Sequence, residues 1–334
     1  MQALKTCCFQ TPAKDLWLIN SFESGFCYQL ITQPIEVRHS SKVSYAIDQN
    51  SHLHLLINQN ATMLHLIWDN SVWQKEILPH IQGERLFTYI DTENNLLVMF
   101  QISGTFSVLT CQSQGDCKVT ELYTHNSDFL PLFFGVKGDK LFIYAVNNTG
   151  NVLLETIFNR ENGQKVQESV IFSTKDYRIE KHWRLPDAVI LVLKNTSSSA
   201  GLLILKICLS TKKQWSKEYK SLEFSSGLSF HLLLAQQDLL FLLSTPGDFY
   251  YAYSYDIGQN WSELHRSDVF SPVFFVDIYT VNNYPTSFIC LPKIKGCLLQ
   301  HPVILSYKEF SAMLYQHKLT LQGDRCRSPK IKKL

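Results

Sequence analysis

The sequence predicts an all-β protein built from repeated groups of antiparallel strands, and three observations support this. Hydrophobic residues make up 45% of the 334 residues and aromatic residues 13%, a composition that favours strands packed around a substantial core. Short apolar runs bounded by Asp, Asn and Gly turns recur along the chain. No capped helical stripe is found, and the nearest candidate, residues 306–322, suits a strand equally well.

Each apolar run follows a polar turn, and the pattern occurs seven times at a spacing of about 45 residues. The copies are KDLWLI (14–19), NSHLHLLI (50–57), ENNLLVMF (93–100), GDKLFIYA (138–145), PDAVILVL (186–193), QDLLFLL (237–243) and, more weakly, NYPTSFICL (283–291). A period of this length is typical of one four-stranded antiparallel blade of a β-propeller. We therefore predict a β-propeller, with seven blades favoured and six as the alternative.

A second feature repeats in phase with the first. Each unit ends in a polar turn followed by an aromatic or polar residue, at Trp73, Cys117, Gln164, Trp215 and Trp261. One full unit is expected to contain strands at KVSYAID (42–48), HLHLLIN (52–58), TMLHLIW (62–68) and SVWQKEIL (71–78).

The two ends of the chain are expected to complete the ring. The first unit starts at its second strand, Leu16–Ile19, and we expect Phe310–Leu321 to lie beside that strand. Residues 1–322 then form a single β-propeller domain, and residues 323–334 form a basic, flexible C-terminal tail.

Charge and hydropathy exclude several kinds of partner. Thirty-one basic residues against 29 acidic ones leave a net charge of +2, which gives no field to recruit nucleic acid or anionic lipid. The N-terminus has no secretory signal pattern, and no run of about 18 apolar residues occurs. We therefore expect a cytoplasmic protein with neither a nucleic-acid nor a membrane partner.

Nine cysteines without a C-x-x-C motif fit the same location. We expect free thiols that pack as small hydrophobic side chains. Cys111 and Cys117 bracket a turn, as do Cys290 and Cys297. Each pair could form a disulfide if the protein were exported.

The stretch SYDIGQNW (254–261) carries one specific motif. It resembles the Asp-box, S/T-x-D-x-G-x-x-W, of sialidases and of other propellers in the same superfamily (BNR repeats), and the matching residues are Ser254, Asp256, Gly258 and Trp261. We expect Asp256 to accept backbone N–H groups in a tight turn, Gly258 to adopt a positive φ, and Trp261 to pack back across the turn. The corresponding turns elsewhere keep only parts of the motif, so the resemblance implies a degenerate sialidase-like propeller in which the box is a structural staple.

Sialidase chemistry does not accompany the motif. That family binds the substrate carboxylate with three arginines and uses a Tyr–Glu nucleophile pair and an Asp acid. Here the early F/Y-R-I-P signature is echoed only by YRIE (177–180). Candidate glycosidase carboxylates are found at turns or strand ends, where Asp caps the backbone; they are Asp48, Asp91, Asp187 and Asp277.

Metal and cofactor binding receive no support either. His52 and His54 share one face of a strand and could be a ligand pair, but the equivalent positions in other units are apolar. Trp73, Trp215 and Trp261 recur once per unit, which favours a structural role over sugar stacking. We expect no metal and no cofactor.

These observations predict a non-enzymatic β-propeller that serves as a binding or scaffold module. Its partner would be a protein or carbohydrate at one face or at the central channel, and no catalytic or binding residue can be assigned. The alternative is a divergent sialidase-like glycoside hydrolase or lectin. Charged clusters at the channel mouth would favour the alternative, whereas an apolar patch on the rim or side would favour a partner surface.

Overall fold

The structure is a computed structural model. It describes Ala312 and the residues from Lys5 to Ser306 except 11–15, 23–24, 31–41, 49, 51, 60–61, 69–72, 79–85, 92, 103–104, 113–115, 123–128, 186, 198–199, 224–227, 236, 246–247, 268–269, 280–284, 295–296 and 299–302. The chain forms two compact units: Met1–Gln214 with Tyr279–Tyr284, and Trp215–Ile278 with Pro285–Leu334. Each is described separately below as unit 1 and unit 2.

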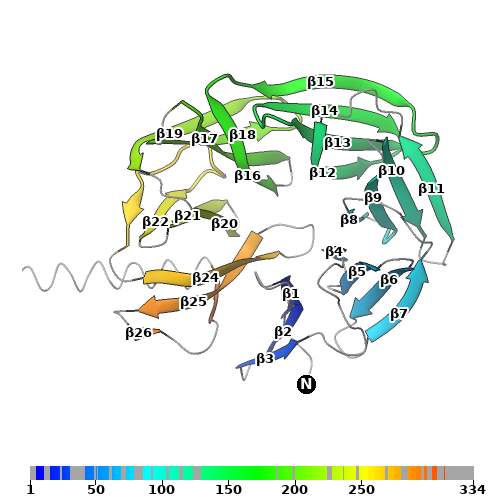
Figure 1. Cartoon of the computed structure of the whole chain (residues 1–334), viewed down its shortest axis with the longest axis horizontal. Helices are drawn as coiled ribbons and strands as arrows, with labels where there is room; N and C mark the ends of the chain where they lie inside the picture. The colour runs from blue at the N-terminus through cyan, green and yellow to red at the C-terminus, as the bar shows by residue number, and fades with distance from the viewer. Residues whose placement is uncertain are drawn as a thin grey trace, which may run out of the picture. The chain divides into compact units, whose positions relative to one another are not determined.

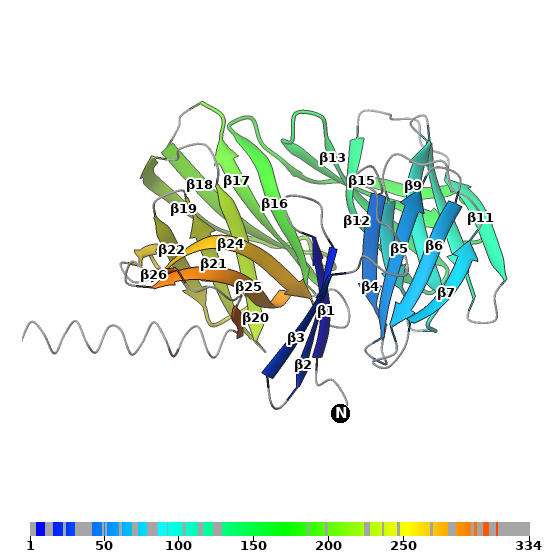
Figure 2. The ribbon, with the colours of Figure 1, turned by 60° about the horizontal axis from the view of Figure 1, so that its bottom comes forward.

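Unit 1 consists of antiparallel sheets whose strands follow one another in chain order (Figure 1). The first sheet contains β1 (Lys5–Gln10), β2 (Leu16–Phe22) and β3 (Gly25–Leu30). The second contains β4 (Lys42–Ile47), β5 (Leu53–Gln59), β6 (Thr62–Trp68) and β7 (Trp73–Leu78), which lie side by side in Figure 2. The third contains β8 (Leu86–Ile90), β9 (Leu96–Ile102), β10 (Thr105–Cys111) and β11 (Cys117–Leu122). The fourth contains β12 (Phe129–Lys137), β13 (Lys140–Asn147), β14 (Val152–Asn159) and β15 (Lys165–Ser173). The fifth begins with β16 (Tyr177–Leu185), β17 (Ala188–Asn195) and β18 (Ala200–Cys208).

Unit 2 continues the same pattern of consecutive antiparallel strands. The unit boundary falls at the start of β19 (Gln214–Glu223). One sheet contains β20 (Ser229–Ala235), β21 (Asp238–Ser244), β22 (Phe249–Ser254) and β23 (His265–Arg266). The other contains β24 (Phe270–Tyr279), β25 (Pro285–Ile294) and β26 (Cys297–Leu298), with β27 (Val303–Ser306) paired to β25. In the described part of the chain, no helix is long and apolar enough to cross a membrane.

The expected all-β class and the four-stranded antiparallel unit are confirmed. The four strands expected between residues 42 and 78 match β4, β5, β6 and β7 to within two residues at each end. The seven apolar runs coincide with β2, β5, β9, β13, β17, β21 and β25, the second strand of each sheet. The fold is a β-propeller, while the number of blades and the single-domain boundary at residue 322 stay predictions.

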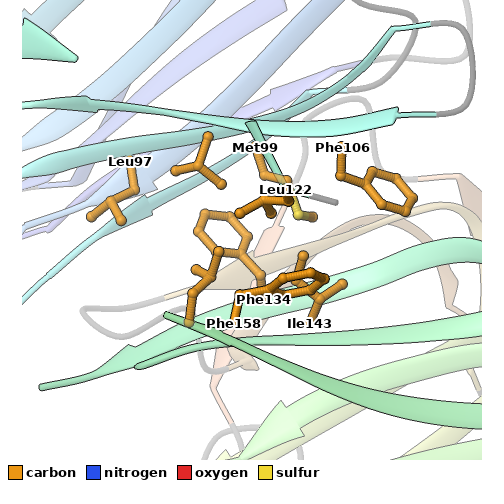
Figure 3. Packing of buried hydrophobic residues seen from close by; sticks show 9 residues of the cluster. Leu97, Met99, Phe106, Leu122, Phe134, Ile143 and Phe158 are labelled. Atoms are coloured by element: carbon orange, nitrogen blue, oxygen red, sulfur yellow. The ribbon is translucent and has the colours of Figure 1, made fainter. Parts of the chain in front are cut away.

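The second strands read as unbroken apolar runs because both of their faces are buried. In β9, Leu96, Val98 and Phe100 pack toward the second sheet. The alternate residues Leu97 and Met99 pack toward the fourth sheet. Figure 3 shows this second contact, with side chains of the third and fourth sheets pointing toward one another. The core of unit 1 therefore lies between neighbouring sheets.

The prediction for the N-terminus is wrong in one respect. Leu16–Ile19 was expected to open the first sheet, with Phe310–Leu321 beside it, but β2 is hydrogen-bonded to β1 on one side and to β3 on the other. Residues 5–10 thus supply the missing first strand, and neither edge of β2 is free for another strand. Apart from Ala312, residues 310–321 and the predicted tail at 323–334 lie outside the described residues.

The expectation of free thiols is wrong for one pair. Cys111, at the end of β10, lies directly opposite Cys117, at the start of β11, and the two form a disulfide. Antiparallel pairing across a short turn brings these side chains together. Nothing in the structure describes the side chains of Cys290 and Cys297, and the cytoplasmic location stays a prediction.

Candidate functional site

Two of the four candidate carboxylates cap the turn after the first strand of their sheets. Asp48 Oδ1 accepts the backbone N–H groups of Asn50 and His52 at 2.9 and 2.8 Å. Asp91 Oδ1 likewise accepts the N–H of Asn95 at 2.8 Å and of Glu93 at 2.9 Å. These carboxylates are therefore occupied by the backbone, as expected for turn-capping residues.

Asp91 has a second partner, and the other two candidates, Asp187 and Asp277, belong to other sheets. Asp91 Oδ2 accepts a hydrogen bond from Arg160 Nη2 of the neighbouring sheet at 3.0 Å. Asp187 is exposed and accepts the Ser210 hydroxyl at 2.5 Å. Asp277 lies within β24, and the described part of the structure does not include its side chain.

The four described arginines occupy separate positions. Arg160 pairs with Asp91, and Arg266 Nε donates to Asp248 at 2.8 Å. Arg178 is exposed on β16, the strand that starts with YRIE. Arg184, on the same strand, is half-buried and contacts two aromatic rings. No three-arginine cluster is therefore formed by the described residues; the other arginines, Arg38, Arg85, Arg325 and Arg327, lie outside them.

The histidine pair noted in the sequence belongs to a row of ionisable groups across the second sheet, in which Asp48, His54 and His65 are buried. Asp48 Oδ2 lies 3.1 Å from His52 Nδ1 and 3.4 Å from His54 Nε2. His54 Nδ1 lies 3.0 Å from His65 Nε2, and His65 Nδ1 lies 3.2 Å from Glu76 Oε2. Burial lowers the pKa of His54 to about 4 and also lowers the pKa of His65. Within the described part, no three His, Cys, Asp or Glu side chains are arranged to hold a metal ion.

Another buried charge lies in the fourth sheet. Glu155 on β14 accepts the Tyr144 hydroxyl at 2.6 Å and Lys212 Nζ at 2.8 Å to both carboxylate oxygens. Burial and the adjacent carboxylate raise the pKa of Tyr144. Lys212 lies in the turn after β18, where its φ is 59°. It is 57 positions from Glu155 along the chain and supplies the counter-charge of that carboxylate. This ion pair links the fourth and fifth sheets. The Glu155 carboxylate is therefore already bonded and is not free to act as a base.

The four residues that resemble an Asp-box, in unit 2, are found at the end of β22 and in the turn that follows it. Asp256 Oδ1 accepts the backbone N–H groups of Gln259 at 3.0 Å and Asn260 at 2.8 Å. Ser254 donates its hydroxyl to Asp256 and accepts the N–H of Gly258 at 2.7 Å. Gly258 has a φ of 78°. Partial burial raises the pKa of Asp256, but hydrogen bonds from Asn260, Ser254 and Gln259 outweigh it and leave that pKa lowered.

Trp261 is buried and meets the edge of the Phe241 ring at a centroid distance of 6.4 Å. The fourth strand does not start there, contrary to expectation, but at His265. Tyr253 N donates to Ser262 Oγ at 3.1 Å instead of to a main-chain carbonyl. The Tyr253 carbonyl still accepts the Ser262 N–H at 2.9 Å, so a side chain replaces one of the two backbone bonds between these residues.

A different signal appears on the fourth strands of unit 1, which lie along its outer side (Figure 1). Ile77 on β7 is 66% exposed, Val119 on β11 is 50% exposed, and Val166 and Val170 on β15 are 58% and 61% exposed. Among the described residues, the only other exposed large hydrophobic side chain is Tyr255 in unit 2. Each of these strands is the last of its sheet and has one free edge. We call the four side chains the outer-strand patch.

Comparison with known proteins shows the class of fold. No protein-family model matches the chain, and no curated protein matches it by sequence. A putative 6-phosphogluconolactonase from Bacteroides uniformis superposes with a TM-score of 0.55 at 11% identity, covering 90% of this chain and 96% of that one. A protein from Lactobacillus plantarum gives 0.53 at 11% identity with the same coverages, and Kuenenia stuttgartiensis hydrazine synthase gives 0.51 at 12% identity over 84% and 81%. The structural neighbours are β-propeller proteins, and at such identities the likeness shows the fold alone.

Sequence reasoning missed both the outer-strand patch and the surroundings of Arg184. The patch had a local signal, because Val166 and Val170 interrupt an otherwise polar fourth strand, KVQESV. The contacts of Arg184 had none, since its partners are 50 or more positions away along the chain.

Proposed function

We propose that the chain is a non-enzymatic β-propeller module that binds a protein partner through the outer-strand patch. The observation that carries this is the exposure of apolar side chains on the fourth strands of three successive sheets. Contiguous exposed apolar side chains mark partner surfaces on soluble proteins, and Val166 and Val170 lie four residues apart on one strand. The neighbouring residues Lys118, Glu121 and Glu168 are exposed and charged, which resembles the polar rim of a protein interface.

The bonding of the candidate carboxylates supports a non-enzymatic role. Retaining and inverting glycosidases need two carboxylates flanking the substrate, one of them free to transfer a proton. Asp48 and Asp91 are instead occupied by turn N–H groups. The alternative, a sialidase-like glycoside hydrolase or lectin, predicts turnover of fluorogenic glycosides or binding on a glycan array, whereas protein binding at the outer-strand patch itself predicts neither.

Paired variants test the partner surface. In cells that express the chain, proximity labelling should lose its enriched proteins when Val166→Lys and Val170→Lys are combined, because two charges enter the apolar contact. Gln167→Lys adds charge to an exposed site on the same strand and should leave the labelling unchanged. Equal labelling by all three proteins would refute the patch as the partner surface.

We also propose that Ser254, Asp256, Gly258 and Trp261 act as a structural Asp-box. Asp256→Ala should lower the free energy of unfolding by about 1–2 kcal/mol, because several turn N–H groups lose their acceptor. Asp116→Ala, at an exposed position in the equivalent turn of the third sheet, should cost much less. An Asp256→Ala variant of unchanged urea midpoint would count against the staple.

A further inference from the structure

Arg184 reaches across the first strands of neighbouring sheets in unit 1. Its Nη1 donates to the Phe134 carbonyl of β12 at 2.7 Å. Its guanidinium carbon lies 5.5 Å from the ring centroid of Tyr89 on β8 and 5.9 Å from that of Phe133 on β12. Two strands, β8 and β12, thus hold the guanidinium of a residue that β16 carries.

Gly135 makes room for this arrangement. A Cβ atom at that position would lie 2.5 Å from Nη2 and 2.9 Å from Nη1 of Arg184, far inside van der Waals contact. The guanidinium therefore lies directly against the backbone of β12. Its place is fixed by the absence of a side chain as well as by two rings and one hydrogen bond.

This held guanidinium has no counter-ion among the described residues. Its described contacts are the Phe134 carbonyl, two aromatic rings and an electrostatic interaction with Tyr144, and none of these is an ion pair. The buried carboxylate of the fourth sheet, Glu155, is already bonded to Lys212. His182, stacked on Phe133 at 5.6 Å, adds no anion, because burial lowers its pKa to about 4 and leaves it neutral near pH 7.

A half-buried charge without a partner is costly, and partly desolvated cations in proteins are normally paired. Guanidinium has five N–H donors, and one of them bonds to an acceptor among the described residues. A carboxylate can accept two of them in a bidentate pair. A phosphate group carries about two negative charges near pH 7, more than one guanidinium balances.

We propose that Arg184 binds the carboxylate of a ligand at the first strands of unit 1. This site is separate from the outer-strand patch, so the inference goes beyond the proposed function and can fail or hold independently of it. The carboxylate could belong to an acidic sugar or to a peptide, and the probes below distinguish these sources.

The first experiment measures binding to the full chain by calorimetry at constant ionic strength. The probes are acetate, glucuronate, N-acetyl-L-phenylalanine and inorganic phosphate, with chloride as the background anion. We expect at least one carboxylate to bind, and Arg184→Gln to weaken its binding about tenfold to a hundredfold. Arg178→Gln removes an exposed arginine from the same strand and should leave the affinity unchanged. Glucuronate preference would indicate an acidic sugar, and N-acetyl-L-phenylalanine preference a peptide.

A second measurement uses the wild-type chain, in case Arg184→Gln fails to fold. Phenylglyoxal modifies arginines, and mass spectrometry gives the rate at each site. The bound carboxylate should slow modification of Arg184 at least about tenfold, matching its occupancy, and should not slow that of Arg178. Binding of phosphate alone, no carboxylate binding, or equal protection of both arginines would overturn the proposal.

Discussion

Replacing His54 with Gln should flatten the dependence of stability on pH between pH 7 and pH 5. His54 is 8% exposed and His65 4% exposed, and they lie between Asp48 and Glu76 in the row across the second sheet. The row has three gaps between its four groups. Two neutral imidazoles bring only two N–H groups, so one gap lacks a proton.

The distances along the row favour the gap between His54 and Asp48 as the one without a proton. If His65 Nδ1–H donates to Glu76 and His54 Nδ1–H donates to His65, then His54 Nε2 faces Asp48 as a bare acceptor. His54 Nε2 is indeed buried without a hydrogen-bond partner, although Asp48 Oδ2 lies 3.4 Å away. One added proton would fill the gap, but burial opposes the resulting charge and keeps the pKa of His54 near 4.

The sign and size of the effect follow from this pKa. Unfolded His54 takes up its proton near pH 6.5, whereas folded His54 does so near pH 4. Between these values the unfolded chain binds more protons, so the free energy of unfolding falls as pH falls. The full shift is worth about 3 kcal/mol, of which about 2 kcal/mol falls between pH 7 and pH 5.

Urea unfolding of the wild type and of His54→Gln at several pH values measures this contribution. Over pH 7 to 5 the wild type should lose about 2 kcal/mol more than the variant. Leu56→Val, a fully buried position on the same strand, should lower the whole curve without changing its slope. Parallel curves for the wild type and His54→Gln would refute the reasoning.

Two further predictions concern turns. Gly163→Ala should cost about 2 kcal/mol more in free energy of unfolding than Gly138→Ala, measured by urea midpoint. Both glycines have a positive φ, near 70° and 62°, but only at Gly163 would a Cβ meet a backbone atom, the Glu121 carbonyl oxygen at 1.9 Å; equal costs would contradict the clash. Cys117→Ser should lower the unfolding free energy by about 2 kcal/mol in non-reducing buffer. A difference that persisted after reduction of the wild type would rule out the disulfide as its cause.

The repeating fold could be predicted because its signals are local. In β17, six consecutive residues from Ala188 to Leu193 are buried, so neighbouring sheets on both faces leave a continuous apolar run in the sequence. The strand β1 was missed for a converse reason. Its sequence, KTCCFQ, is short and mixed, and only its pairing with β2 defines it as a strand.

The candidate sites could not be predicted to the same extent, because their contacts join residues from different sheets. Arg184 meets the Phe134 carbonyl across 50 positions, and Lys212 meets Glu155 across 57. A single sequence shows each of these as an ordinary charged residue. His54 and His65 were equally ambiguous, since their alignment depends on the register of β5 and β6, in which His54 pairs with Ile67 and His65 with Leu56.

Several buried or half-buried charges of unit 1 have partners that satisfy them. Asp91 is paired with Arg160, Glu155 with Lys212, and Asp48 with turn N–H groups. Arg184 is held by one carbonyl and two rings without an opposite charge among the described residues, and departures from such local consistency are expected at functional sites. In each sheet the first strand, the kind of strand that holds Arg184, is separated from the fourth strand by three strand spacings, about 14 Å. A carboxylate bound at Arg184 would therefore leave the outer-strand patch open, and the two surfaces should bind their ligands independently.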